Sequence, residues 1–432
     1  MDHDAHEMTE PTSAPAPAGP RIALFGLGTV GTAVAARLLD PAWGEALTAR
    51  DLPVPRLVGI ADLDLERERG LTIPAHVRQV TDYTELLDDE VDTVIELIGG
   101  SSVAGEAVLA AFAAGKDVVT ANKDLIARRG HEIEDAAREA GTSLRFEAAV
   151  LAGVPVLGPL VGELCAAQVS AIRGIFNGTT NYILSTMAAD AREYDEVLQE
   201  AQARGFAEAD PVSDVEGFDA AYKLVLLSRL AWDGWITVDD VRRSVPTLGT
   251  EAADGITGVK RSHMSVAARL GLAIRLVSRA ERSANGIRGG VTPMAVSAAS
   301  TVGTTAGVTN LVEITADPVE RVSMAGPGAG GPPTSSGVLA DVLALAMGAG
   351  STWGRLPAAR DMAIEDDLDG ERGWLVVLEG LGQAGFPDAV RELALASTDE
   401  GFVSRPSTLA TLSGKLGVFD RAVTFYPILS DA

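Results

Sequence analysis

The sequence predicts an α/β protein with three parts: a doubly wound parallel sheet of the Rossmann type, an α+β domain, and a small C-terminal α+β unit. Apolar strands alternate with helical segments from Arg21 to Glu147, which is typical of a parallel sheet covered by helices on both faces. The first strand runs directly into Gly-Leu-Gly-Thr-Val-Gly and then into a helical pattern. A glycine turn in this context is typical of dinucleotide binding.

In such a turn the first glycine makes the bend, the second lets a pyrophosphate approach the backbone, and the third packs the helix on the strand. We therefore predict that NAD or NADP binds here, at Gly26, Leu27, Gly28, Thr29, Val30 and Gly31.

The second strand ends at Asp62, where an acid commonly holds the ribose hydroxyls of the cofactor. Arg67 and Arg69 follow closely and could meet a 2'-phosphate instead. The sequence leaves the choice between NAD and NADP open.

Further cofactor contacts are expected beyond later strands, because ligands of such sheets lie outside the carboxyl ends of the strands. Ile98 and Gly99 end the strand that starts at Val91, and Lys123 follows the next strand. Lys123 could simply be solvated at a helix N-terminus. A cation is poorly placed there, which favours a ligand contact.

The segment from Ser143 to Leu160 enters the second domain, and Glu147 lies inside its apolar stretch. A buried carboxylate needs a partner, and a monovalent cation held with nearby carbonyls is one way to provide it. Further on, Asn177 and Thr179 stand at a strand-to-helix turn. Their donors suit a substrate carboxylate or a nicotinamide amide, but they equally suit an ordinary helix cap.

The stretch from Ala201 to Lys223 gathers carboxylates ahead of one lysine, namely Glu208, Asp210, Asp214, Glu216 and Asp219. Carboxylates can hold an ammonium group while the lysine gives or takes a proton. Asp219 and Lys223 stand four residues apart, so they share one face of a helix. A solvated surface salt bridge is the alternative, but the apolar sequence that follows places this helix near a core.

The remaining pattern predicts a second sheet between Trp232 and Thr315. A glycine-rich segment from Ala325 to Thr334 then precedes an apolar helix, and its backbone could approach a ligand. From Gly350 we expect a small unit with strands over 360–365, 390–396 and 421–429 and helices over 373–385 and 407–417. Residues 1–20 are expected to be a disordered tail, since they combine acids with a Pro/Ala tract.

Composition excludes several classes of function. The net charge of −25 argues against binding to nucleic acid or to an anionic membrane, and no segment is long and apolar enough to span a bilayer. The single cysteine, Cys165, fits a cytoplasmic protein and is expected to be buried and structural. None of the five histidines lies in a motif, which disfavours a zinc site or a histidine acid/base.

From about Arg21 to Gly348 the chain resembles homoserine dehydrogenases, through its glycine turn, Thr-Ala-Asn-Lys, Phe-Glu-Ala-Ala-Val, the turn at Asn177, the Ala201–Lys223 stretch and Gly-Ala-Gly-Gly-Pro-Pro-Thr. The resemblance implies NAD(P)-dependent interconversion of L-aspartate 4-semialdehyde and L-homoserine, a step of threonine and methionine biosynthesis. It implies that Lys223 is the proton donor, that Glu208 and Asp219 hold the substrate, and that Lys123 lies between nicotinamide and substrate.

The resemblance also places Gly205 and Gly330 near the cofactor and implies a sodium ion held by Glu147 with the carbonyls of Val150, Ala152 and Val154. It implies a homodimer formed through the sheet of the second domain. Asp62 differs from the arginine of many relatives, and residues 350–432 replace or blur the ACT regulatory domain that many relatives carry, so threonine inhibition is not expected.

The expected divisions are a cofactor domain over 21–147, a catalytic and dimerisation domain over 148–324, a segment over 325–349 that returns to the cofactor domain, and the C-terminal unit over 350–432. Two alternatives stay open: a related oxidoreductase for another amino-acid-derived aldehyde or alcohol, and a non-catalytic regulator that binds a nucleotide or an amino acid.

Overall fold

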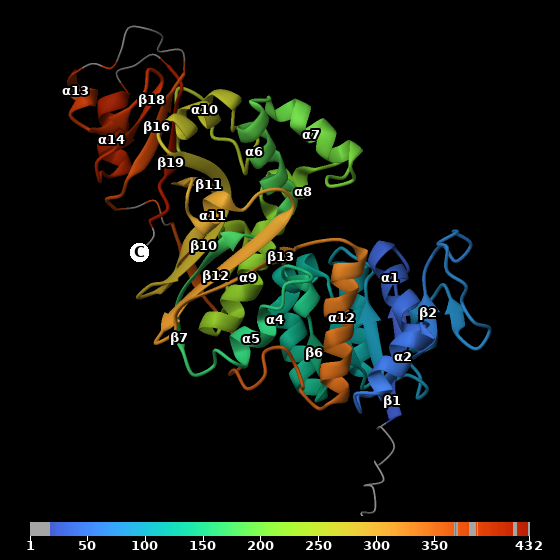
Figure 1. Cartoon of the computed structure of the whole chain (residues 1–432). Coiled ribbons are helices and arrows are strands. Elements are labelled where there is room, and N and C mark those ends of the chain that lie inside the picture. Colours follow the sequence, from blue (N-terminus) through green and yellow to red (C-terminus); the bar gives the residue numbers. More distant parts are fainter. Residues whose placement is uncertain are drawn as a thin grey trace, which may run out of the picture.

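The computed structural model describes residues 18–430, except for 367, 369, 380–385, 387 and 418–420. The first strand, β1, begins at Ala18, so the expectation of a tail reaching residue 20 is wrong for its last three residues. Residues 1–17 of that tail lie outside the described residues. Figure 1 shows three parts along the chain: a cofactor domain at the N-terminal end, a central sheet with its helices, and a C-terminal unit at the far end.

The cofactor domain contains a six-stranded parallel sheet in the order β3-β2-β1-β4-β5-β6. This is the order of a doubly wound dinucleotide-binding fold, and it confirms the predicted fold class. Its strands are β1 (Ala18–Phe25), β2 (Val54–Ala61), β3 (Arg78–Val80), β4 (Thr93–Glu96), β5 (Asp117–Thr120) and β6 (Leu144–Arg145). The sheet order reverses direction between β1 and β4, so a crevice for ligands is expected at their carboxyl ends.

Helices cover both faces of this sheet, namely α1 (Thr29–Leu38), α2 (Pro41–Thr48), α3 (Val103–Ala113), α4 (Lys123–Ala140) and, from much later in the chain, α12 (Gly331–Ala346). Figure 1 shows α12 beside α1, so the segment after the glycine-rich stretch does return to the cofactor domain. Val338 and Val342 of α12 are fully buried against the core of this domain. Their burial explains why an apolar helix follows a glycine-rich segment.

The second sheet has the order β13-β12-β7-β10-β11-β15, and every pairing except β11 with β15 is antiparallel. Its strands are β7 (Gln168–Ile175), β10 (Leu272–Arg282), β11 (Gly286–Ser297), β12 (Thr309–Asp317), β13 (Glu320–Pro327) and β15 (Ala363–Glu365). The helices of this part are α5 (Leu157–Val161), α6 (Gly178–Asp190), α7 (Tyr194–Ala203), α8 (Val212–Val215), α9 (Phe218–Trp232), α10 (Arg261–Arg269) and α11 (Thr301–Thr304).

The C-terminal unit is an antiparallel sheet in the order β17-β18-β16-β19-β9 with two short helices. Its elements are β16 (Trp374–Leu378), α13 (Asp388–Arg391), β17 (Ala394–Ser397), β18 (Gly401–Ser404), α14 (Leu409–Leu416) and β19 (Val423–Pro427), while β9 (Thr247–Leu248) joins from the central part. Strand, helix, strand, strand, helix and strand in this sheet order form a ferredoxin-like motif.

Three predictions for this unit are wrong in whole or in part. The strand expected over 360–365 does not join this sheet: it forms β14 (Arg360–Asp361), which pairs with β8 (Gly234–Trp235), and β15, which pairs with β11. The strand expected over 390–396 begins only at Ala394, because Val390 and Arg391 belong to α13.

The run Gly373–Gly385 was expected to be a helix, but Trp374–Leu378 form the buried strand β16 between β18 and β19. Five consecutive apolar residues carry no period that separates a buried strand from a buried helix, so tertiary pairing decides. Residues 380–385 of the expected helix lie outside the described residues.

Helices α4 and α9 join the cofactor domain to the central part. The fully buried guanidinium of Arg229 on α9 donates two hydrogen bonds, at 2.9 and 2.7 Å, to the equally buried carboxylate of Glu134 on α4. Arg138 and the indole N–H of Trp235 also donate to that carboxylate. The contact is therefore a buried polar network in which the carboxylate of Glu134 accepts hydrogen bonds from three residues.

Candidate active site

The glycine turn adopts the geometry that its sequence predicts. Gly26 has a φ of +92°, and a Cβ atom there would lie 2.5 Å from the carbonyl oxygen of Leu97. A Cβ on Gly31 would lie 2.1 Å from the carbonyl oxygen of Gly26, because the helix packs directly on the turn. A Cβ on Gly28 would meet no atom within 4 Å. The middle glycine thus faces open space, which leaves room for a pyrophosphate.

Asp62 lies beside this turn, beyond the end of β2. One carboxylate oxygen accepts a hydrogen bond from the backbone N–H of Leu27 at 2.5 Å, and the other accepts one from the guanidinium of Arg69 at 3.1 Å. Arg69 also donates to the carbonyl oxygen of Leu27 at 2.7 Å. The acid and the arginine that the sequence offered as alternatives for the ribose therefore form one ion pair against the turn.

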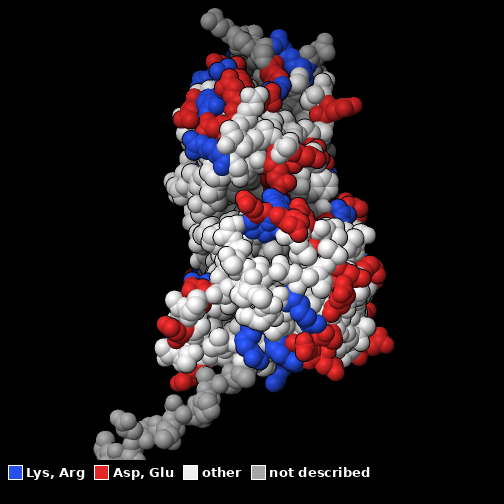
Figure 2. Space-filling model, turned by 90° about the vertical axis from the view of Figure 1, so that its right-hand side faces the viewer, with Lys and Arg blue, Asp and Glu red and all other residues white. Residues whose placement is uncertain are grey.

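A cavity of about 720 Å³ lies where the cofactor domain meets the central part. Val30 of the glycine turn, Lys123, Lys223 and Gly330 all line it, although they lie far apart in the sequence. On the face shown in Figure 2, acidic and basic side chains crowd together about half-way up the molecule, above the cofactor domain. The predicted cofactor turn and the predicted proton donor thus meet at one cavity.

Lys223 is 5% exposed, and its ammonium group has two partners. It donates to a carboxylate oxygen of Asp219 at 2.7 Å and to the carbonyl oxygen of Phe176 at 2.6 Å. Burial lowers the pKa of Lys223, while the charge of Asp219 acts in the opposite direction. A lysine whose pKa is brought down from its usual value is suited to exchange a proton with substrate near neutral pH.

Asp219 also contacts the second lysine of the cavity. Its other carboxylate oxygen lies 3.1 Å from the ammonium nitrogen of Lys123, the first residue of α4, and this interaction raises the pKa of Lys123. Burial alone would raise the pKa of Asp219, but the two ammonium groups lower it well below its usual range. For Asp214, burial and the nearby charge of Asp219 raise the pKa. The carboxylates of the cavity are therefore electrostatically distinct.

The amide and hydroxyl donors at the start of α6 are already bonded within the protein. Asn177 caps α6 through its oxygen and donates from its amide to Asp214 at 2.6 Å and Asp219 at 2.8 Å. The hydroxyl of Thr179 donates to the carbonyl oxygen of Phe206 at 2.7 Å. Asn177 thus caps the helix and also holds the acids of the cavity, while a contact of Asn177 and Thr179 with substrate or nicotinamide stays a prediction. Glu208 and Gly205 line the cavity as well.

Two family models match the two parts of the chain that meet at this cavity. The model of the family "Homoserine dehydrogenase, NAD binding domain" matches residues 26–147, and the model of the family "Homoserine dehydrogenase" matches residues 155–343. The chain is 38% identical over 327 residues to the homoserine dehydrogenase of Synechocystis and 37% identical over 331 residues to that of Corynebacterium glutamicum. These alignments cover 75% of this chain and 72% and 71% of the respective relatives.

This chain belongs to the homoserine dehydrogenase family. Among solved structures, a homoserine dehydrogenase from Thiobacillus denitrificans superimposes with a TM-score of 0.82 at 29% identity, covering 95% of this chain and 98% of that one. A hyperthermophilic archaeal homoserine dehydrogenase in complex with NADPH has the same fold, with a TM-score of 0.60 at 24% identity over 76% of this chain and 98% of that one. The chain is thus an NAD(P)-dependent oxidoreductase of this family.

Glu147, which the homoserine dehydrogenase resemblance assigns to a sodium ion, has backbone partners. Its carboxylate accepts hydrogen bonds from the N–H groups of Val156, Leu157 and Gly158 at 2.7–2.8 Å, at the start of α5. The described residues contain no cluster of three His, Cys, Asp or Glu side chains that could hold a metal. Any ion here would therefore depend mainly on carbonyl oxygens.

The structure tests the expectation for the single cysteine. Cys165 is exposed, so the prediction of a buried structural cysteine is wrong; it lies in a loop between α5 and β7. No helix in the described part of the chain is long and apolar enough to cross a membrane.

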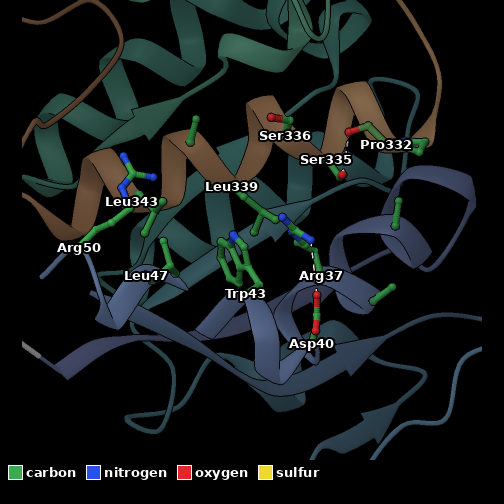
Figure 3. Close-up of a pocket in the computed structure, with 13 residues that line it drawn as sticks. Arg37, Asp40, Trp43, Leu47, Arg50, Pro332, Ser335, Ser336, Leu339 and Leu343 are labelled. Atoms are coloured by element: carbon green, nitrogen blue, oxygen red, sulfur yellow. Dashed lines mark hydrogen bonds and ion pairs between the residues drawn. The ribbon is translucent and has the colours of Figure 1, made fainter. Parts of the chain in front are cut away.

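A second hollow, of about 640 Å³, lies between α12 and the helices α1 and α2 and shares no lining residue with the cavity around Lys223. Figure 3 shows its mainly apolar lining, with Trp43 and Leu339 facing each other and an ion pair of Arg37 with Asp40 nearby. It lacks any paired lysine and carboxylate, and we assign no part of the homoserine dehydrogenase reaction to it.

Sequence reasoning predicted Ile98, Gly99 and Lys123 but missed Glu96, which lies behind them. Glu96 ends β4 and is fully buried. Its carboxylate accepts hydrogen bonds from Ile98, Gly99 and Asn122, the residue before Lys123. A charged residue at the end of the apolar run Val-Asp-Thr-Val-Ile-Glu, just ahead of two glycines, was the available signal.

Proposed function

We propose that the cavity binds L-homoserine or L-aspartate 4-semialdehyde beside NAD(P), and that Lys223 takes and gives the proton of the hydroxyl group. The observation that carries this proposal is the buried Lys223 amine, held by Asp219 in a cavity shared with the glycine turn. Bound nicotinamide supplies or accepts the hydride. The substrate must therefore lie between Lys223 and the cofactor side of the cavity.

In the oxidising direction, a neutral Lys223 takes the proton of the substrate hydroxyl; in the reducing direction, its ammonium form returns a proton to the developing alkoxide. A positioned general acid of this kind contributes about 10²–10⁴-fold to the rate. The hydrogen bond to the carbonyl oxygen of Phe176 orients the amine, and Asp219 stabilises its charged form. Lys123 stands on the opposite side of Asp219 and adds a positive charge to the cavity wall.

We propose that Glu208, Asp214 and Asp219 hold the substrate ammonium group. All three line the cavity, and Glu208 is exposed, so its carboxylate is free to turn toward a ligand. Asn177 and Thr179 support this arrangement indirectly, because Asn177 holds two of the acids and Thr179 holds the loop at Phe206. We expect Lys123 to balance the substrate carboxylate.

The cofactor-binding residues are proposed to be the turn over 26–31 together with Asp62, Ile98, Gly99, Lys123, Gly205 and Gly330. The proposal covers both NAD and NADP. Asp62 would accept a ribose hydroxyl, whereas Arg69 would favour a 2'-phosphate, and the two are paired with each other. Initial rates with NAD+ and with NADP+ measure which of the two cofactors the protein prefers.

A sodium ion at Glu147 is a further proposal. Residues Leu151 and Ala152 have positive φ values of 56° and 45°, which turns the local carbonyl groups away from a regular path. Among the described residues, no hydrogen bond ends on the carbonyl oxygens of Val150, Ala152 or Val154. Oxygen ligands of this kind suit a hard cation, which would tie α5 to this turn.

We further propose a cytoplasmic homodimer that acts in threonine and methionine biosynthesis. The single cysteine supports a reducing compartment. Strand β13 forms one edge of the second sheet, and within the described residues no strand pairs with its outer side, so this sheet has an edge that a second copy could use. For the C-terminal unit, an ACT-like role is supported by its ferredoxin-like strand order alone.

The test of the substrate is an initial-rate comparison of L-homoserine with related amino alcohols, each with NAD+ and with NADP+. We expect L-homoserine to give the highest kcat/KM. A much higher value for another compound would favour the alternative of a related oxidoreductase. Absence of turnover with every substrate, with cofactor binding retained, would favour a non-catalytic regulator instead.

A further inference from the structure

Glu96 is a buried carboxylate with an unusual set of partners. It is 0% exposed and lies at the carboxyl end of β4, next to the point where the order of the parallel sheet reverses. One of its oxygens accepts a hydrogen bond from the hydroxyl of Thr120 at 2.6 Å. The other accepts from the backbone N–H groups of Ile98 at 2.8 Å and Gly99 at 3.3 Å, and from the amide of Asn122 at 3.5 Å.

These donors belong to two different parts of the cofactor crevice. Ile98 and Gly99 lie in the loop over 97–100 that leaves β4, and Gly26 of the glycine turn rests against this loop, close to the peptide that joins Leu97 to Ile98. Ile98 is 37% exposed. Glu96 therefore fixes a loop that touches the turn and presents an apolar side chain.

The other two donors, Thr120 and Asn122, lie just before Lys123 in the chain. Thr120 ends β5, and its hydroxyl oxygen accepts a hydrogen bond from the N–H of Asn122 at 2.9 Å. Asn122 caps α4 by accepting from the N–H of Leu125 at 3.1 Å, and its amide also donates to the carbonyl oxygen of Gly100 at 2.7 Å. One carboxylate thus joins the loop after β4 to the helical turn on which Lys123 stands.

Burying a carboxylate such as that of Glu96 away from water is unfavourable unless its oxygens accept hydrogen bonds. Burial raises the pKa of Glu96. A neutral glutamine would avoid that penalty but would place an amide against Thr120, whose oxygen already accepts from Asn122. The donor set therefore fits a carboxylate better than the neutral side chain of the same shape.

We propose that Glu96 is a positioning residue that holds the nicotinamide side of the cofactor site in shape, by tying the loop over 97–100 to the first turn of α4. This inference rests on the proposed function, because it places the nicotinamide between Ile98, Gly99 and Lys123. Glu96 itself is buried and does not touch the ligand. It acts through Ile98, Gly99 and Asn122.

The experiment uses two variants in the full chain. Glu96→Gln keeps one acceptor oxygen, and we expect about a tenfold higher KM for the cofactor with a smaller change in kcat. Glu96→Ala removes every acceptor, and we expect about a 100-fold loss of kcat/KM, the size of effect that a displacement of about 1 Å produces in an active site. Titration of the reduced cofactor by its fluorescence measures affinity separately from turnover.

Glu313→Gln is the matched control. Glu313 is also a buried carboxylate on a strand, but it accepts a hydrogen bond from Arg173 at 2.8 Å in the second sheet. We expect this control to lower the melting temperature and to keep the cofactor KM. An equal rise in cofactor KM in Glu313→Gln, or unchanged cofactor affinity and KM in Glu96→Gln, overturns the inference. If the unaltered protein binds cofactor but does not oxidise homoserine, the proposed function fails, while the cofactor titrations still decide the role of Glu96.

Discussion

Replacing Lys223 by methionine tests the proposed proton transfer most directly. Methionine is unbranched, apolar and of similar length, so it fills the same buried space without an amine. The loss of a positioned general acid and base lowers kcat by about 10²–10⁴-fold, which corresponds to about 3–5 kcal/mol of transition-state stabilisation. We expect this loss in both directions of the reaction.

The structure also indicates that Lys223→Met folds. Asp219 keeps Lys123 at 3.1 Å and the amide of Asn177 at 2.8 Å, so the buried carboxylate is not left without partners. The carbonyl oxygen of Phe176 does lose its hydrogen bond, which lowers the free energy of unfolding by about 1–3 kcal/mol. Relief of the buried ammonium group acts in the opposite direction.

The assay follows the absorbance of the reduced cofactor at saturating homoserine, alongside a fluorescence titration of cofactor binding. The expected result is a large fall in kcat with cofactor affinity retained. A fall in kcat smaller than about tenfold, with the fold intact, would refute the assignment of proton transfer to Lys223. Lost cofactor affinity would instead indicate that the substitution disturbs the cavity as a whole.

Three further predictions follow from the same structure. Asp219→Asn removes a charge that raises the pKa of Lys223. Because oxidation needs the neutral amine, we expect the rise of kcat/KM with pH to occur at lower pH in this variant, and a pH–rate profile measures the shift. Gly28→Ala weakens cofactor binding by about 1–3 kcal/mol, or about 5- to 150-fold in Kd, with stability unchanged. Gly31→Ala instead lowers stability, because its methyl group meets a carbonyl oxygen, and thermal melts with cofactor titrations separate the two effects. Arg229→Met lowers the free energy of unfolding by about 3–5 kcal/mol, because it removes a charged partner from the buried carboxylate of Glu134. Urea titrations measure this change, and a value below about 1 kcal/mol would contradict this account.

Local patterns in the sequence predicted the parts of the site that depend on neighbouring residues. The bend at Gly26 and the contact at Gly31 follow from the spacing of three glycines, and the pair of Asp219 with Lys223 follows from the helical repeat. Each of these features depends on residues that lie close together in the sequence. The sequence alone therefore predicted both the cofactor turn and the lysine–carboxylate pair.

Features that depend on distant segments were not predictable in this way. Asp62 and Arg69 were weighed as alternatives, but the fold pairs them with each other and with Leu27. The apolar run at Trp374 forms a strand only because β18 and β19 lie on either side of it. Cys165 is exposed because its loop runs over the surface, which no local pattern indicated. Contacts between distant segments decided the first two of these cases, and the surface path of a loop decided the third.

The two helices that bring the lysines together show how distant pairing sets the site. Lys123 and Glu134 on α4 contact Asp219 and Arg229 on α9, so the helices run in the same direction with an ion pair near each end of the contact. The pair of Glu134 with Arg229 is fully buried, and Glu134 also accepts hydrogen bonds from Arg138 and Trp235, so the pair fixes how far one helix can slide along the other. At the other end the side chain of Lys123 is 36% exposed, so it can leave Asp219 for a substrate carboxylate without disturbing the core. A rigid pair in the interior thus allows an exchangeable pair at the cavity.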